Sequence, residues 1–179
     1  MEKTLQLGLI ARLSREVGLK NNKLGRKAFQ KIVHLSNSIG KIPTGYSFSY
    51  YIYGPFSREL SSDLEIAEIA GIISSTQDIS TGSYDIKVGD MASSAEKNAS
   101  EYLTQQDKNL NRILTAFGDK SPRNLELYST LVFVEQAESN LRGNADALVK
   151  RIISLKPKYD DSEIRAAIVY IENFRNSLN

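Results

Sequence analysis

Few side chains in this sequence could perform acid–base, nucleophilic or metal chemistry. The chain has no cysteine and a single histidine, His34. The lack of cysteine excludes disulfides, thiol catalysis and thiolate metal sites. One histidine excludes a two-histidine metal site or an HExxH helix and leaves a histidine-based triad unsupported. No GxxxxGK[ST] or GxGxxG pattern is present. We therefore expect a protein that is not an enzyme and that has no metal and no cofactor.

Two other groups have chemical uses that compete with structural ones. Asp160 and Asp161, with Glu163, are acidic enough to bind a cation, but their place before a predicted helix favours N-capping. The aromatic segment 46–53 offers ring faces on which nucleic-acid bases could stack. Its β-propensity explains the same rings by packing, and the structural interpretation is favoured in both cases. The stacking candidates are Tyr50, Tyr51 and Tyr53.

The basic side chains are concentrated at the start of the chain. Residues 1–45 contain nine Lys or Arg and two acids, residues 46–91 contain two and seven, and the remainder contains twelve of each. Such a basic segment is typical of a surface that contacts phosphates. On the helix predicted for residues 25–39, the polar arc includes a glutamine and the histidine, which we expect to be exposed or half-exposed. The predicted nucleic-acid-binding residues are Lys20, Lys23, Arg26, Lys27, Gln30, Lys31, His34 and Lys41.

The elements that position these side chains begin with a winged helix-turn-helix-like order. Apolar residues at helical spacing and glycine stops predict helices in the first 71 residues, and alternation predicts strands. Thr81-Gly82 is the expected turn of a terminal hairpin, which would be the wing. The predicted elements are helices over about 3–17, 25–39 and 58–70, a strand over 46–53 that Gly54-Pro55 breaks, and hairpin strands at 72–73 and 84–88.

The second half of the chain is predicted to be helical throughout. Capping patterns and a proline at a first helical position mark helix starts, which gives helices over about 94–117, 122–139, 144–155 and from 160 onward. The fold class is therefore α+β and mostly helical. A winged helix-turn-helix-like module over 1–90 precedes an all-α region over 91–179, either as separate domains or around one shared core.

The sequence also suggests where the protein works. Its N-terminus lacks the basic start and apolar run of a signal peptide, and no stretch approaches the roughly 20 apolar residues of a membrane span. We expect a cytoplasmic protein without a membrane partner, and the sequence identifies no small-molecule substrate.

Two segments together resemble a known family. The basic helix 25–34 is followed by an aromatic strand that ends in Tyr-Gly-Pro-Phe-Ser at 53–57. This pattern resembles the YwgA-like uncharacterised proteins and, more distantly, the Panacea (antitoxin-associated) domain, and segments 121–136 and 155–159 also look like the YwgA-type C-terminal region. His34 departs from the pattern, where tyrosine is more usual. The resemblance implies winged-helix-like architecture, DNA binding or regulation and, for the Panacea relatives, neutralisation of a toxin.

The motif at 53–57 can also be read physically. Gly54 suits a turn with unusual dihedrals, Pro55 prevents continuation of the strand, and Ser57 can cap the next helix. Gln30 could bridge from the basic helix to the backbone of this turn. The motif is therefore either a corner that fixes the fold or a binding site. Its residues are Tyr53, Gly54, Pro55, Phe56 (a candidate hydrophobic staple) and Ser57.

Two hypotheses follow. The first is a nucleic-acid-binding or regulatory protein of winged-helix type that uses its basic second helix. Against it, the predicted reading helix 58–70 contains one arginine and four acids, and the predicted wing contains only Lys87 as a cation. The alternative is a protein–protein interaction module, antitoxin-like or an adaptor, with a protein partner or as a homodimer and without direct DNA binding. The sequence leans toward the first hypothesis.

Overall fold

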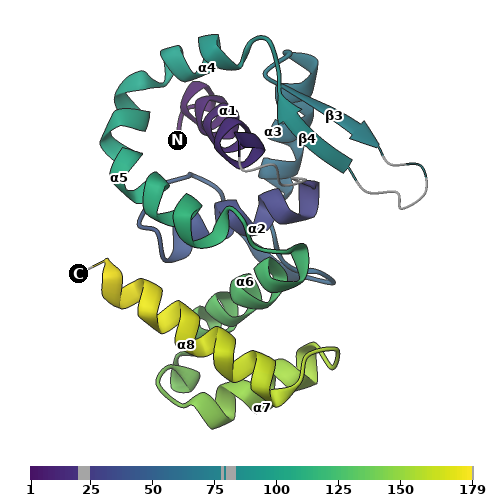
Figure 1. The fold of residues 1–179 in the computed structure, drawn as a ribbon, viewed down its shortest axis with the longest axis vertical. Helices are drawn as coiled ribbons and strands as arrows, with labels where there is room; N and C mark the ends of the chain where they lie inside the picture. The colour runs from purple at the N-terminus through teal and green to yellow at the C-terminus, as the bar shows by residue number, and fades with distance from the viewer. Residues whose placement is uncertain (20–24, 78, 80–83, 179) are drawn as a thin grey trace.

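The computed structural model describes residues 1–19, 25–77, 79 and 84–178. These residues form a mostly helical α+β fold with two small antiparallel sheets. None of the described helices is both long and apolar enough to cross a membrane. The elements are α1 (Lys3–Leu19), α2 (Arg26–Ser38), β1 (Ser49–Tyr51), β2 (Gly54–Phe56), α3 (Arg58–Ile69), β3 (Ile73–Gln77), β4 (Tyr84–Val88), α4 (Ala92–Asn98), α5 (Ser100–Phe117), α6 (Pro122–Ala137), the short 3₁₀ helix η1 (Ser139–Leu141), α7 (Ala145–Leu155) and α8 (Asp161–Ser177) (Figure 1).

Helix α1 lies inside an arc formed by α4 and α5, with α3 on its other side (Figure 1). Gly8 allows this close approach, because a Cβ built there would lie 2.2 Å from the Cβ of Ala99. The single helix predicted over 94–117 is wrong at this point. The chain bends at Ala99, with φ −106° and ψ 14°, so that α4 and α5 follow the surface of α1. The tertiary contact with α1 imposes this bend. No glycine or proline lies at the bend, so the sequence pattern does not indicate it.

The strand predicted over 46–53 is shorter than expected and belongs to a tight hairpin. Strand β1 pairs with β2, with Tyr51 opposite Gly54 and Ser49 opposite Phe56. The Gly54-Pro55 pair was expected to end extended structure, but it begins the second strand. Pro55 is tolerated because the sheet has only two strands, so its missing N–H leaves no inner ladder unpaired. Ile52 and Tyr53 form the tip of this hairpin.

The second hairpin, β3–β4, confirms the strands predicted at 72–73 and 84–88. Its register runs from Ile73 opposite Val88 to Gln77 opposite Tyr84. The hairpin extends away from the helices (Figure 1). The turn predicted at Thr81-Gly82 lies outside the described residues.

Helices α6, α7 and α8 begin where their capping residues predict, whereas α4 begins at Ala92, before the predicted start at 94, and without a side-chain cap. Ser121 caps α6 by accepting a hydrogen bond from Asn124 N at 3.2 Å. Asp160 and Glu163 form a capping box at α8: Asp160 Oδ1 accepts from Glu163 N at 2.8 Å, and Glu163 Oε2 accepts from Asp160 N at 3.1 Å. The N-capping role predicted for this acidic segment is therefore confirmed.

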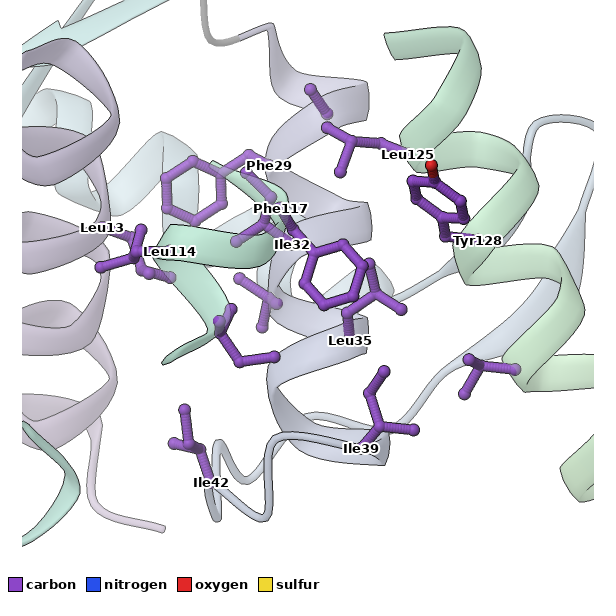
Figure 2. Packing of buried hydrophobic residues seen from close by; sticks show 14 of the residues in the cluster. Leu13, Phe29, Ile32, Leu35, Ile39, Ile42, Leu114, Phe117, Leu125 and Tyr128 are labelled. Carbon is purple, nitrogen blue, oxygen red and sulfur yellow. The ribbon is translucent and has the colours of Figure 1, made fainter. Parts of the chain in front are cut away.

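The buried hydrophobic cluster includes residues from both halves of the chain. Figure 2 shows Phe29 and Ile32 of α2 facing Leu114 and Phe117 of α5, with Leu125 of α6 on the other side. Helix α2 is therefore packed on two sides, against α5 and against α6. The division into units 1–90 and 91–179 stays a prediction, and this cluster is continuous across it.

Candidate functional site

The polar arc of α2 is not a solvent-facing surface. His34 is only 1% exposed, so the prediction that it is exposed or half-exposed is wrong. Its Nδ1 lies 2.9 Å from Ser129 Oγ on α6 and its Nε2 lies 3.2 Å from Ser38 Oγ. Burial, and then the charge of Lys31, lower the pKa of His34 to about 3, so the ring is neutral. His34 is buried because α6 packs directly on the polar arc of α2.

Gln30 makes the contact predicted for it. Its Nε2 donates to the carbonyl oxygen of Ser57 at 2.9 Å, and its Oε1 accepts from Ser57 N at 2.9 Å. Ser57 in turn caps α3 by accepting from Leu60 N at 3.2 Å. The Gln30 amide therefore holds the corner between β2 and α3, and with 3% exposure it is not positioned to contact a surface ligand.

Lys31 is also turned inward. Its Nζ donates to the carbonyl oxygen of Pro55 at 2.6 Å, and the residue is only 4% exposed. Burial lowers the pKa of Lys31 to about 8, against the opposing effect of the Glu126 carboxylate. The predicted phosphate-contacting role of Lys31 on an open helix face therefore does not fit its position, because the hairpin covers it.

A second lysine holds the hairpin from the other half of the chain. Lys156, just after α7, donates to the carbonyl oxygen of Ile52 and, at 2.8 Å, to Glu126 Oε1. Lys158 donates to Glu126 Oε2, also at 2.8 Å. Burial opposes the charge of Glu126, but these two hydrogen bonds hold its pKa below the ordinary value. Sequence reasoning missed this cluster; only the resemblance of segment 155–159 to YwgA-type proteins marked it, without a role.

Three side chains thus fix the motif at 53–57 and the residue before it. Gln30 and Lys31 of α2 and Lys156 after α7 donate to backbone carbonyls, which are those of Ser57, Pro55 and Ile52, respectively. Gly54 has φ +82°, and a Cβ there would lie 2.7 Å from Thr130 Oγ1 on α6. This buried hydroxyl has no hydrogen-bond partner among the described residues. These contacts favour the interpretation of the motif as a structural corner.

The remaining predicted cations have different environments. Arg26 forms an ion pair with Glu68 at 2.7 Å and lies 4.6 Å from the centroid of the Tyr84 ring. Lys27 is exposed, and its Nζ lies 3.6 Å from the centroid of the Tyr53 ring. Lys41 is exposed and lies three residues after the end of α2 at Ser38. The predicted residues Lys20 and Lys23 lie outside the described residues.

The exposed Lys27 borders a pocket of about 290 Å³, here called the cationic pocket, between α2, the start of α6 and the segment after α7. Arg123 at its rim pairs with Glu163 at 2.9 Å and donates to the carbonyl oxygen of Lys158 at 2.7 Å. The one carboxylate in its lining, Glu126, already accepts two ammonium groups. The lining residues are Lys27, Ala28, Lys31, Tyr53, Pro122, Arg123, Glu126 and Lys158.

A second pocket of about 250 Å³, here called the apolar pocket, adjoins the first. The rings of Tyr51 and Phe56 line it, with centroids 5.8 Å apart, and Leu64 of α3 contributes an aliphatic surface. Lys27, Lys31 and Tyr53 line both pockets. The geometry thus places an aromatic surface beside a positively charged one, which suits an anion with an attached planar group. Among the described residues, no three His, Asp or Glu side chains gather as a metal site would need.

Comparison with known proteins gives one distant relative. No family model matches the chain. The chain is 23% identical to the uncharacterized protein YwgA of Bacillus subtilis (strain 168) over 155 residues, which cover 85% of this chain and 87% of that protein. This similarity supports the resemblance to YwgA-like proteins seen in the sequence, whereas the resemblance to the Panacea domain stays a prediction. The chain is thus similar, over most of its length, to an uncharacterised YwgA-like protein.

Proposed function

We propose that the chain is a non-enzymatic nucleic-acid-binding or regulatory protein whose contact surface is the cationic pocket and the adjoining hairpin tip. The observation that carries this proposal is the exposed tip of the β1–β2 hairpin beside clustered cations. Tyr51 and Tyr53 are 57% and 46% exposed, and the ammonium of Lys27 lies against the second ring. Aromatic faces next to phosphate-contacting cations are the usual combination in proteins that bind single strands.

The surface favours a single strand over a duplex. The element order supports a winged-helix architecture, in which α3 would be the reading helix and β3–β4 the wing. However, the exposed charges of α3 are Arg58 against Glu59 and Glu65, which repel phosphates overall. The hairpin β3–β4 offers only Lys87, beside Asp85. We therefore place the contact at the cationic pocket and not at the expected reading helix.

The strength of this contact can be bounded. Each base stacked on an aromatic side chain contributes about 1–3 kcal/mol. Lys27, Arg123 and Lys158 are the partly or fully exposed cations of the pocket. Three phosphate contacts on a single strand give a slope of about −2 in log K against log salt.

Fluorescence anisotropy with a labelled 12-nucleotide single strand and the corresponding duplex tests the proposal. We expect tighter binding of the single strand and a strong salt dependence. The double variant Lys27→Gln, Lys158→Gln should lose most of the binding. The matched control, Lys97→Gln with Lys108→Gln, removes two exposed lysines elsewhere and should bind normally. Circular dichroism confirms that each variant is folded. Absence of binding at about 50 mM salt, or equal loss in the control, would refute the proposal.

A protein-interaction module is the second candidate, and the exposed apolar tip favours it. Ile52 is 68% exposed between two exposed tyrosines, and aromatic anchors of this kind are enriched at protein interfaces. The partner would be another protein, as for an antitoxin-like or adaptor role, or a second copy of the chain. Analytical ultracentrifugation of the native chain and of Ile52→Ser tests the homodimer. A dimer that Ile52→Ser dissociates would support this alternative, and a monomer at all concentrations would exclude self-association.

A further inference from the structure

The two pockets lie next to each other and differ in chemistry. They share Lys27, Lys31 and Tyr53 as walls, and they measure about 250 and 290 Å³. Each is smaller than the 300–1,000 Å³ typical of a site for a drug-sized ligand. Each half is therefore sized for one small group, and a ligand that fills both must join an apolar planar group to a compact anion.

The apolar pocket suits one planar ring. Its lining includes the rings of Tyr51, Tyr53 and Phe56, which offer stacking faces and edges. Two of its polar groups are already engaged, since the Gln30 amide is bonded to Ser57 and the Arg26 guanidinium to Glu68, and most of the remaining lining is apolar or aromatic. A ring in this pocket would therefore be held by stacking and apolar contact and not by a pattern of hydrogen bonds.

The cationic pocket suits a phosphate. Lys27, Lys31, Arg123 and Lys158 line it, and its single carboxylate is neutralised by two lysines. A guanidinium and several ammonium groups around a small cavity are the usual partners of a phosphate dianion.

We infer that this double pocket holds one nucleoside monophosphate unit, with the base in the apolar pocket and the phosphate in the cationic pocket. The inference rests on the proposed function and specifies the ligand unit of the same site. The unit has two possible sources: a free nucleotide, or one nucleotide of a strand whose neighbours run along the exposed hairpin tip. Because stacking does not distinguish bases, and the Ser61 hydroxyl and the Lys27 ammonium are the only non-aromatic polar groups of the apolar pocket's lining to which the described residues offer no hydrogen bond, we expect less than about tenfold preference between bases.

Isothermal titration calorimetry of the full chain with AMP, UMP, adenosine and ribose 5-phosphate tests the inference. AMP and UMP should bind within tenfold of each other. Adenosine and ribose 5-phosphate, each of which fills only one pocket, should bind at least tenfold more weakly. Lys158→Gln should weaken AMP binding and leave adenosine binding unchanged, whereas Tyr53→Ala should weaken both. Lys97→Gln is the control and should change neither.

Competition with a labelled 12-nucleotide strand distinguishes a free nucleotide from one nucleotide of a strand as the ligand. It also tests nucleotide binding in the double pocket separately from nucleic-acid binding. Displacement of the strand by AMP supports the inference with a strand as the ligand. Binding of AMP without binding of the strand supports the inference with a free nucleotide as the ligand and overturns nucleic-acid binding. If the strand binds but 10 mM AMP neither binds nor competes, the inference is overturned and nucleic-acid binding stands. If neither binds, both are overturned.

Discussion

Replacing Gln30 by leucine removes the bridge between α2 and the corner at Ser57. In the native chain the Gln30 amide forms two buried hydrogen bonds of 2.9 Å with the backbone of Ser57, one in each direction. The Ser57 carbonyl also accepts from Ser61 N at 3.1 Å, so it keeps one partner in the variant. The Ser57 N–H has no second acceptor among the described backbone contacts and would be left unpaired in a buried position.

The expected loss follows from this asymmetry. A buried donor without a partner costs about 1–3 kcal/mol, and the second hydrogen bond contributes about 0.5–1.5 kcal/mol. Leucine fills a similar volume and recovers roughly 1 kcal/mol through its apolar surface. The free energy of unfolding of Gln30→Leu should therefore fall by about 2 kcal/mol, within a range of about 0.5–3.5 kcal/mol. For a chain of this size, a fall of about 2 kcal/mol lowers Tm by roughly 4–8 °C.

Urea denaturation followed by circular dichroism measures this difference. The matched control is Gln105→Leu, because Gln105 is exposed on α5 and its substitution should change stability by less than about 0.5 kcal/mol. Gln30→Glu is a second probe: it keeps the acceptor, but it places a carboxylate oxygen against the Ser57 carbonyl and should destabilise at least as much as leucine. A loss below about 0.5 kcal/mol in Gln30→Leu, equal to that of the control, would refute the bridging role.

Three further predictions concern lysine ionisation and close backbone contacts. Because burial lowers the pKa of Lys31 to about 8 from 10.5, the unfolded chain binds more protons between these values, and the free energy of unfolding should rise by about 2 kcal/mol from pH 8 to 10. Urea titrations should show this rise and its loss in Lys31→Met; a flat native profile would contradict it. Gly54→Ala should cost about 2–4 kcal/mol through its positive φ and its contact with Thr130, and less in a Thr130→Ala background, as a double-mutant cycle measures. Gly8→Ala should lower stability by about 1–3 kcal/mol by thermal denaturation, and Ala99→Gly should restore part of it, because the two methyl groups would otherwise overlap; no recovery would argue against this contact as the cause.

Local chemistry made much of the fold predictable. The caps at Ser57 and Asp160 could be recognised because a capping side chain bonds backbone groups within three residues of itself. Amphipathic spacing marked α1, α3 and α8 because each presents one apolar stripe to the core. The Gln30 bridge was also predicted, since a glutamine on a neighbouring helix can bond a turn amide that has no backbone partner.

The candidate site was less predictable because it depends on distant contacts. His34 lies on an arc that a single helix presents as polar, and only the packing of α6 buries it. The Lys156 contact with Ile52 joins residues 104 positions apart, and no periodic pattern links them. The pocket around Arg123 likewise combines the basic helix α2 with segments of the second half, where the charges are balanced in the sequence. Helical periodicity describes one element at a time, whereas this site combines four segments: α2, the β1–β2 hairpin, the start of α6 and the segment after α7.

The bond from Lys156 to the hairpin tip also affects the order in which the chain can fold during synthesis on the ribosome. The tip residue Ile52 is synthesised long before its partner Lys156, which belongs to the last seventh of the chain. Until that segment leaves the exit tunnel, the hairpin tip lacks one of the side chains that fix it and its aromatic residues are displayed by an unfinished fold. Contacts of such long sequence separation form late and slowly. The nascent chain is therefore most vulnerable to wrong association at the same aromatic surface that we propose as the ligand contact.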